Sequence, residues 1–226
     1  METKEDKISR FLLICGVLAP VMMIIIIIIV GEITPNYSPV SNTISQMGTP
    51  NSRYAIVLNS GYVFYAILMG SASYGLYRSM NFTTTARTLA ILLGIHASFT
   101  GLLGIFADTL DVLPKSFSDD FIHNSIAAIS YSPLILCIFI FRRVALQDRT
   151  LKVAGTLGLL VIAINLPLPI TPYIGPLEVI NGLLQRLLTG SAFLWLTLIF
   201  ILLYRKIYNY KVRNMLQDRQ VYVISK

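Results

Sequence analysis

The residues best suited to chemistry are polar side chains that recur at helical spacing within apolar segments. Asp120, His123 and Asn124 lie three and four residues apart. This spacing puts them on one face of a helix, and Ala127 and Tyr131 continue that face. An imidazole beside a carboxylate can act as a general base or bind a metal ion. The pattern therefore indicates a place for proton transfer or ligand binding.

A second polar stripe lies further along the chain. Glu178, Asn181 and Gln185 recur on one helical face, with Arg186 at its edge. Because polar side chains are unfavourable against lipid, both stripes are expected to turn toward neighbouring helices. Both stripes lie at the ends of their helices that are expected to face the outer side of the membrane. Together they predict an outward-opening polar pocket.

Three further polar residues are expected near this pocket, because they lie in or beside apolar segments that reach the same side. The full candidate set is Glu32, His96, Asp108, Asp120, His123, Asn124, Glu178, Asn181, Gln185 and Arg186. Each also has a structural interpretation. Carboxylates near helix ends can be solvated, Arg186 can pair with Glu178 or Asp120 to neutralise a buried charge, and His96 can be a hydrogen-bonded core residue. No catalytic role is assigned to any of them.

Metal and cofactor chemistry has little support in the sequence. A catalytic zinc site commonly uses three protein ligands, and the chain contains only two histidines. His96, His123 and one carboxylate would form such a site only if their helices meet. No G-x-S-x-G, H-E-x-x-H, phosphate-loop or dinucleotide motif is present, and these are the patterns that would indicate hydrolase or nucleotide chemistry. We expect no metal and no cofactor.

The elements that must position these residues are membrane helices. The chain of 226 residues is 55% hydrophobic and 13% charged, which is about half the charge of an average soluble domain. We predict an all-α polytopic membrane protein, a single integral membrane domain over residues 1–226 with six transmembrane helices. The expected spans are about 11–30, 55–77, 88–107, 121–141, 153–170 and 177–204.

Basic residues predict how the helices are oriented. Fifteen of the 18 Lys and Arg lie in the N-terminal segment, in the connections after the second and fourth spans, or in the tail 205–226. By the positive-inside rule, both termini are expected in the cytoplasm and the protein in the cell (plasma) membrane. The net charge of +7 is then mainly a topology signal. The basic cytoplasmic tail can contact anionic lipid, and nucleic-acid binding is not expected.

The first outer loop shows an ordered pattern between residues 35 and 48, PNYSPVSNTISQMG. Ser38 can cap a helix that starts at Pro39, and Val40, Ile44 and Met47 recur on one face. This pattern predicts a short amphipathic helix at the membrane interface. The tyrosines that flank the outer interface, Tyr37 and Tyr54, are interpreted as part of an aromatic belt.

The same segment resembles the signature of the family called domain of unknown function 998. In that family a Tyr-Ser-Pro element and an Asn-x-Ile-Ser element follow the first membrane helix, as residues 37–39 and 42–45 do here. The resemblance extends to a histidine near the start of the fourth span, here His123. It implies a bacterial or archaeal six-helix membrane protein whose activity is not established.

Three functions fit these observations. We favour binding of a lipid headgroup or small solute in the outward-facing pocket. An intramembrane hydrolase acting on lipid, with or without a metal, is an alternative that would use Asp120 and His123. A structural or interaction subunit is another. Membrane lipids are the expected partners, and the small-residue stripe Gly94, Ser98, Gly101 favours close helix packing within the bundle or in a homo-oligomer.

Overall fold

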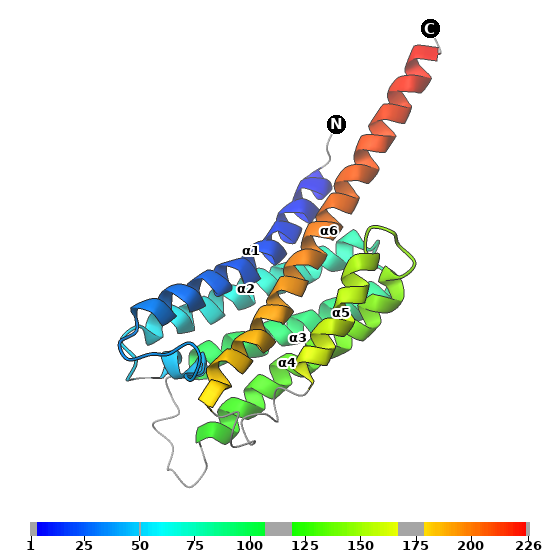
Figure 1. Cartoon of the computed structure of the whole chain (residues 1–226). Coiled ribbons are helices and arrows are strands. Elements are labelled where there is room, and N and C mark those ends of the chain that lie inside the picture. The colour runs from blue at the N-terminus through cyan, green and yellow to red at the C-terminus, as the bar shows by residue number, and fades with distance from the viewer. Residues whose placement is uncertain (1–3, 50, 107–118, 167–178, 225–226) are drawn as a thin grey trace.

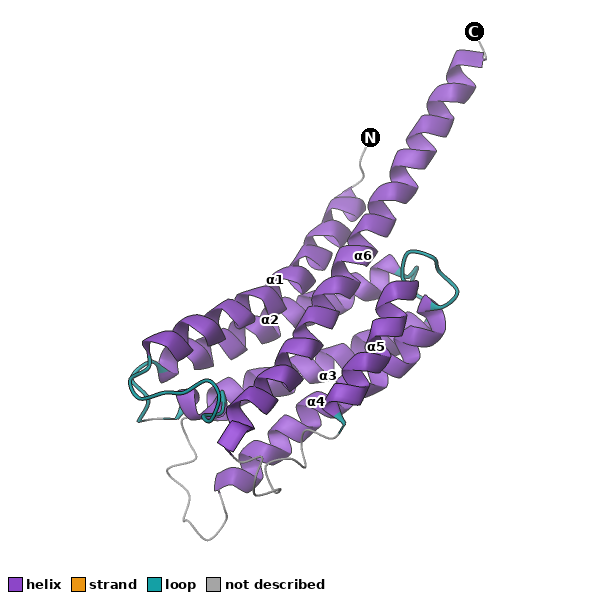
Figure 2. Ribbon diagram, in the orientation of Figure 1, coloured by secondary structure: helices purple, strands orange, loops and turns teal. Residues whose placement is uncertain are grey.

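The chain folds into a helical bundle. The computed structural model describes residues 4–49, 51–106, 119–166 and 179–224, excluding the side chains of 119–122, 124 and 210–224. These residues form six α-helices and one short 3-10 helix, with no strand among them (Figures 1 and 2). The elements are α1 (Lys4–Ile33), η1 (Ser45–Gly48), α2 (Ala55–Ser79), α3 (Thr84–Phe106), α4 (Asp119–Ala145), α5 (Lys152–Asn165) and α6 (Asn181–Ile224).

The helices form a closed ring. Each packs against the next in the sequence, and α6 closes the ring by packing on α1. Figure 1 shows that the start of α1 and the far end of α6 lie at the same end of the bundle, here called the terminal end. The segments 34–49 and 51–54 lie at the opposite end, here called the loop end. Consecutive helices therefore run in alternating directions.

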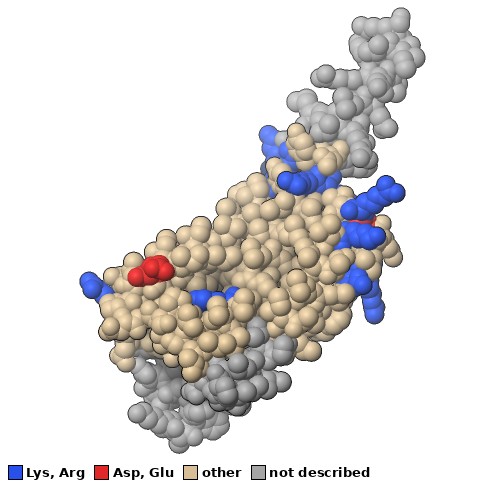
Figure 3. Space-filling model, in the orientation of Figure 1, with Lys and Arg blue, Asp and Glu red and all other residues tan. Residues whose placement is uncertain are grey.

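The outer surface of the ring is apolar. Ile56 is 73% exposed and Phe11 is 65% exposed, and in water such a surface would be costly. Five helices are long and apolar enough to cross a bilayer, while α5, with 14 residues, is a shorter apolar helix. Figure 3 shows the Lys and Arg of the described residues gathered mainly at the terminal end, beside a wide uncharged belt. The chain is a multi-pass membrane protein.

The last helix continues to Ile224, and the part of it that is apolar enough to cross a membrane is Asn181–Asn209. One element differs from the prediction. The first outer loop contains only the 3-10 helix Ser45–Gly48 instead of an amphipathic helix from Pro39. The side chain of Asn42 accepts the Ser38 N–H at 2.8 Å, and the side chain of Gln46 accepts the Thr43 N–H at 2.9 Å. These side chains satisfy backbone donors locally and so compete with helix formation.

Close contact between α2 and α3 depends on glycine. A Cβ at Gly104 would lie 2.3 Å from the backbone oxygen of Asn59, and one at Gly101 would lie 2.7 Å from the Cβ of Ala66. The small-residue stripe thus packs at Gly101 against α2 of the same chain, whereas Ser98 is exposed. A homo-oligomer that uses this stripe stays a prediction.

We predict that Gly104→Ala lowers the free energy of unfolding by about 1–3 kcal/mol, because the added methyl group must push α3 away from α2. The matched control is Gly94→Ala on the same helix, where the nearest atom to an added Cβ is 3.9 Å away. Thermal unfolding in mild detergent measures the difference. Equal melting temperatures for the two variants would contradict the close helix contact.

Candidate functional site

The first outer loop folds back onto the beginning of α6. The Leu183 N–H donates to the Val40 carbonyl at 2.9 Å, and the Ile44 N–H donates to the side-chain oxygen of Gln185 at 2.5 Å. The two segments meet so closely that a Cβ at Gly182 would lie 2.2 Å from the Asn42 carbonyl oxygen. Glycine is therefore required where the loop crosses α6.

Arg186 fastens this loop. Its Nη1 donates to the carbonyls of Pro39 at 2.9 Å and of Asn42 and Gly182 at 3.0 Å, and its Nη2 donates to the Tyr37 hydroxyl. The guanidinium also lies over the Tyr37 ring, 5.3 Å from its centroid. The Tyr37 hydroxyl in turn donates to the carbonyls of Asn42 and Thr43. We call the arrangement of Tyr37, Pro39, Asn42, Gln185 and Arg186 the clasp.

The clasp leaves the charge of Arg186 without a counter-ion among the described residues. Its partners are carbonyls and a phenol, and no described carboxylate forms an ion pair with it. Burial raises the pKa of Tyr37 and outweighs the opposing effect of Arg186, so the phenol is neutral at physiological pH. Glu178 and Asp120 are the two carboxylates with which Arg186 could pair in the structural interpretation, and both lie outside the described side chains.

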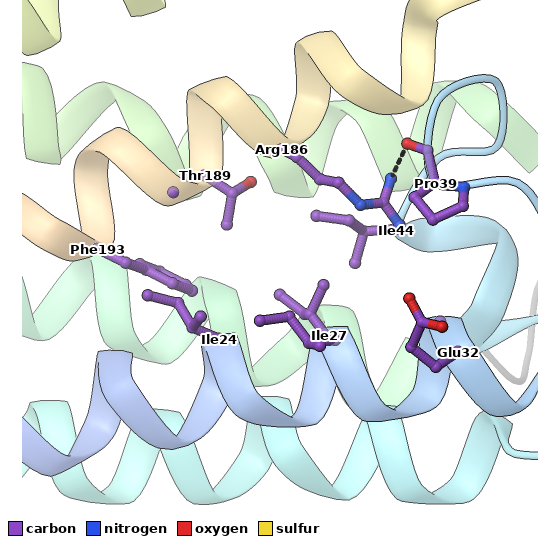
Figure 4. Close-up of a pocket in the computed structure, with 11 residues that line it drawn as sticks. Ile24, Ile27, Glu32, Pro39, Ile44, Arg186, Thr189 and Phe193 are labelled. Atoms are coloured by element: carbon purple, nitrogen blue, oxygen red, sulfur yellow. Dashed lines mark hydrogen bonds between the residues drawn. The ribbon is translucent and has the colours of Figure 1, made fainter.

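An apolar groove opens beside the clasp, between α1 and α6. Its volume is about 290 Å³. Figure 4 shows Ile24, Ile27 and Phe193 along its walls, with Arg186 and Glu32 at the end nearest the loop. Glu32 is exposed. We call this the α1–α6 groove; its complete lining is Ile24, Ile27, Ile28, Gly31, Glu32, Pro39, Ile44, Arg186, Thr189, Gly190 and Phe193.

A smaller polar cavity, of about 50 Å³, lies on the inner side of the groove. Among its lining residues are three members of the candidate set, His96, His123 and Gln185. The other polar residues that line it are Ser45, Tyr62, Thr100, Ser130, Tyr131 and Thr189. Three residues, Ile44, Thr189 and Phe193, line both spaces. The inner cavity and the groove are therefore adjacent.

His96 joins three helices at the base of the inner cavity. Its Nδ1 lies 2.9 Å from the Ser130 carbonyl and its Nε2 lies 2.8 Å from the Tyr65 hydroxyl. Because a carbonyl can only accept, Nδ1 is assigned the proton and Nε2 accepts from Tyr65. Thr100 and Ser130 add a hydroxyl pair at 2.7 Å. With both ring nitrogens engaged, His96 holds α2, α3 and α4 together.

The loop residues of the clasp, Tyr37, Pro39 and Asn42, belong to the segment on which the family resemblance rests. The family described as "Protein of unknown function (DUF998)" matches residues 17–202. The chain belongs to this family. No curated protein and no solved structure matches the chain significantly. The family match spans the clasp, the groove and the inner cavity, so all three belong to the DUF998 region of the chain.

The remaining candidates of this DUF998 chain are placed as follows. Asp108 and Glu178 lie outside the described residues, and Asp120 and Asn124 lie in the first turns of α4 with side chains that are not described. Asn181 begins α6, half-buried, and it lines neither the groove nor the inner cavity. Among the described residues, no three side chains of His, Cys, Asp or Glu lie close enough together to hold a metal ion.

The polar patterns of the sequence did not reveal three residues that belong to the clasp or line the cavities. The place of Tyr37 beside the outer interface predicts an aromatic-belt residue, and it does not predict the hydrogen bonds of Tyr37 within the clasp. Tyr62 and Phe193 are hidden in apolar helices, and no pattern distinguishes them from core or lipid-facing residues. Tyr37 belongs to the Tyr-Ser-Pro element, and this is the feature of the sequence that could have singled it out. The element indicates that the loop is important, but it does not indicate that Tyr37 contacts Arg186 on α6.

We predict that Gly182→Ala detaches the loop from α6, because the new methyl group would lie 2.2 Å from the Asn42 carbonyl oxygen, which is too close for non-bonded atoms. Gly190→Ala is the matched control on the same helix, since an added Cβ there meets nothing within 4 Å. Amide hydrogen exchange should become faster at Ile44 and Leu183 in the first variant only. Unchanged protection at both amides would show that the loop does not depend on this contact.

Proposed function

We propose that this DUF998 protein binds a membrane phospholipid, with an acyl chain in the α1–α6 groove and the phosphate at Arg186. The observation that carries the proposal is a guanidinium with only neutral described partners at the end of an apolar groove. Anions bind most strongly where a cation is partly removed from water. An apolar chain with an anionic end is the ligand that complements both parts of the groove.

The dimensions and surroundings of the groove support a lipid. Its volume of about 290 Å³ lies near the lower bound of about 300 Å³ for small-molecule sites. Its walls contain Ile24, Ile27 and Ile28 of a helix that is apolar enough to span a bilayer. In a membrane, lipid chains surround such a helix, so a chain is the molecule most available to fill the groove.

The guanidinium has capacity for another partner. Its Nη1 makes three bonds and its Nη2 one, while Nε donates to none of the described residues. A guanidinium can bind a phosphate through two N–H groups at once. Because the clasp fixes the side chain in place, a phosphate would meet an arginine that has already lost much of its conformational freedom.

The inner cavity gives less support to the hydrolase alternative. A base or metal ligand needs a ring nitrogen that faces the substrate, and both nitrogens of His96 are bonded within the protein. His123 also lines this cavity, but it is not among the residues that line the groove. No geometry among the described residues favours hydrolysis over binding.

We predict that Gly190→Leu weakens lipid binding, because Gly190 lines the groove and a side chain there would fill it. Overpacking by about 1 kcal/mol corresponds to about fivefold weaker binding. Gly70→Leu is the matched control, since an added Cβ at that helical glycine also meets nothing within 4 Å. Native mass spectrometry from mild detergent measures bound phospholipid. Equal occupancy in both variants would overturn the proposed groove.

We also propose that the chain crosses the membrane six times with both termini in the cytoplasm. The loop end then faces outward. The basic residues near the terminal end support this orientation. We predict that a membrane-impermeant maleimide labels Asn51→Cys on intact cells and labels Asn81→Cys only after lysis. Both positions are exposed, and the native Cys15 and Cys137 are buried. The reverse pattern would contradict this orientation.

A further inference from the structure

Two opposite charges line the α1–α6 groove without pairing with each other. Arg186 and Glu32 lie at its loop end, one from α6 and one from α1 (Figure 4). Arg186 is bonded to the clasp, and among the described residues Glu32 forms no ion pair. Two charges that share a groove mouth and remain separate suit a ligand that carries both signs. A dianionic headgroup would be repelled by Glu32, and a cationic one by Arg186.

We propose that the preferred occupant is a zwitterionic phospholipid with a primary amine, whose phosphate contacts Arg186 and whose ammonium contacts Glu32. The inference rests on the proposed lipid site and specifies its headgroup. A primary ammonium is a compact donor of three N–H groups, which a carboxylate accepts directly. The headgroup chemistry is a phosphoethanolamine, present either in a membrane lipid or as a free phosphomonoester or phosphodiester.

The surroundings favour a primary amine over a quaternary one. Quaternary ammonium groups are recognised by the faces of aromatic rings. Tyr37 is the tyrosine beside the groove mouth, where its ring lies 3.5 Å from a Cβ placed on Gly31. Arg186 already lies over that ring at 5.3 Å. One face of the Tyr37 ring is thus already occupied by a cation, and the exposed carboxylate of Glu32 is suited to N–H donors.

The test offers the purified full chain an equimolar mixture of dioleoyl phosphatidylethanolamine, phosphatidylcholine and phosphatidylglycerol, and reads retained lipid by native mass spectrometry. Because Glu32 is exposed, we expect a preference for phosphatidylethanolamine of about two- to fivefold. The isosteric variant Glu32→Gln should remove the preference for phosphatidylethanolamine over phosphatidylglycerol. The matched control Glu5→Gln, at an exposed position of the terminal end, should keep it.

A second arm offers free phosphoethanolamine at millimolar concentration. If it binds in a Glu32-dependent way, the headgroup alone is sufficient, and if only the lipid binds with that dependence, the acyl chain is also required; both results support the inference. Retention of all three lipids without preference, or a preference that Glu32→Gln leaves unchanged, overturns the inference but leaves the lipid site in place. Failure to retain any lipid overturns the proposed function itself.

Discussion

The loop end of this protein is organised by one guanidinium bonded to neutral groups. A charge removed from water is costly unless hydrogen bonds replace its hydration. Arg186 obtains those bonds from the carbonyls of Pro39, Asn42 and Gly182 and from the hydroxyl of Tyr37. The first two carbonyls are available only when the loop is folded onto α6. The fold of the loop and the position of the charge therefore depend on each other.

The first turns of α6 contribute residues to both the inner cavity and the α1–α6 groove. Consecutive residues of an α-helix point about 100° apart, so Gln185 lines the inner cavity while Arg186 lines the groove. One turn further on, Thr189 belongs to both spaces, and its hydroxyl lies 2.9 Å from that of Tyr131 on α4. This division separates a polar interior, which holds the helices together, from a groove of mostly apolar walls with one cation and one carboxylate at its mouth.

Much of this architecture could be predicted from the sequence, because the bilayer restricts what an apolar segment can do. The apolar runs indicated the helices and their approximate bounds, and the small residues of the third span indicated a close helix contact. The helical spacing of His123, Tyr131 and Gln185 placed them on inward faces, and the structure brings these three together around one cavity.

Other features depend on contacts between residues far apart in the chain. Asn42 and Gln46 satisfy backbone donors locally and interrupt the helix expected from Pro39, which helical periodicity does not reveal. The sequence predicts Arg186 as a pocket residue, and the structure adds that it binds a loop that begins about 150 positions earlier in the chain. A sequence pattern cannot show that pairing, since it depends on α6 returning to pack on α1.

The most direct test of this account is a double-mutant cycle between Tyr37 and Arg186, read as the free energy of local opening at the Ile44 amide by hydrogen exchange. Tyr37→Phe removes the hydroxyl and keeps the ring, and Arg186→Met removes the charge and keeps much of the aliphatic chain. A hydrogen bond to a charged group should give a coupling of about 1–3 kcal/mol. Additive effects of the two substitutions would contradict the central role of the clasp.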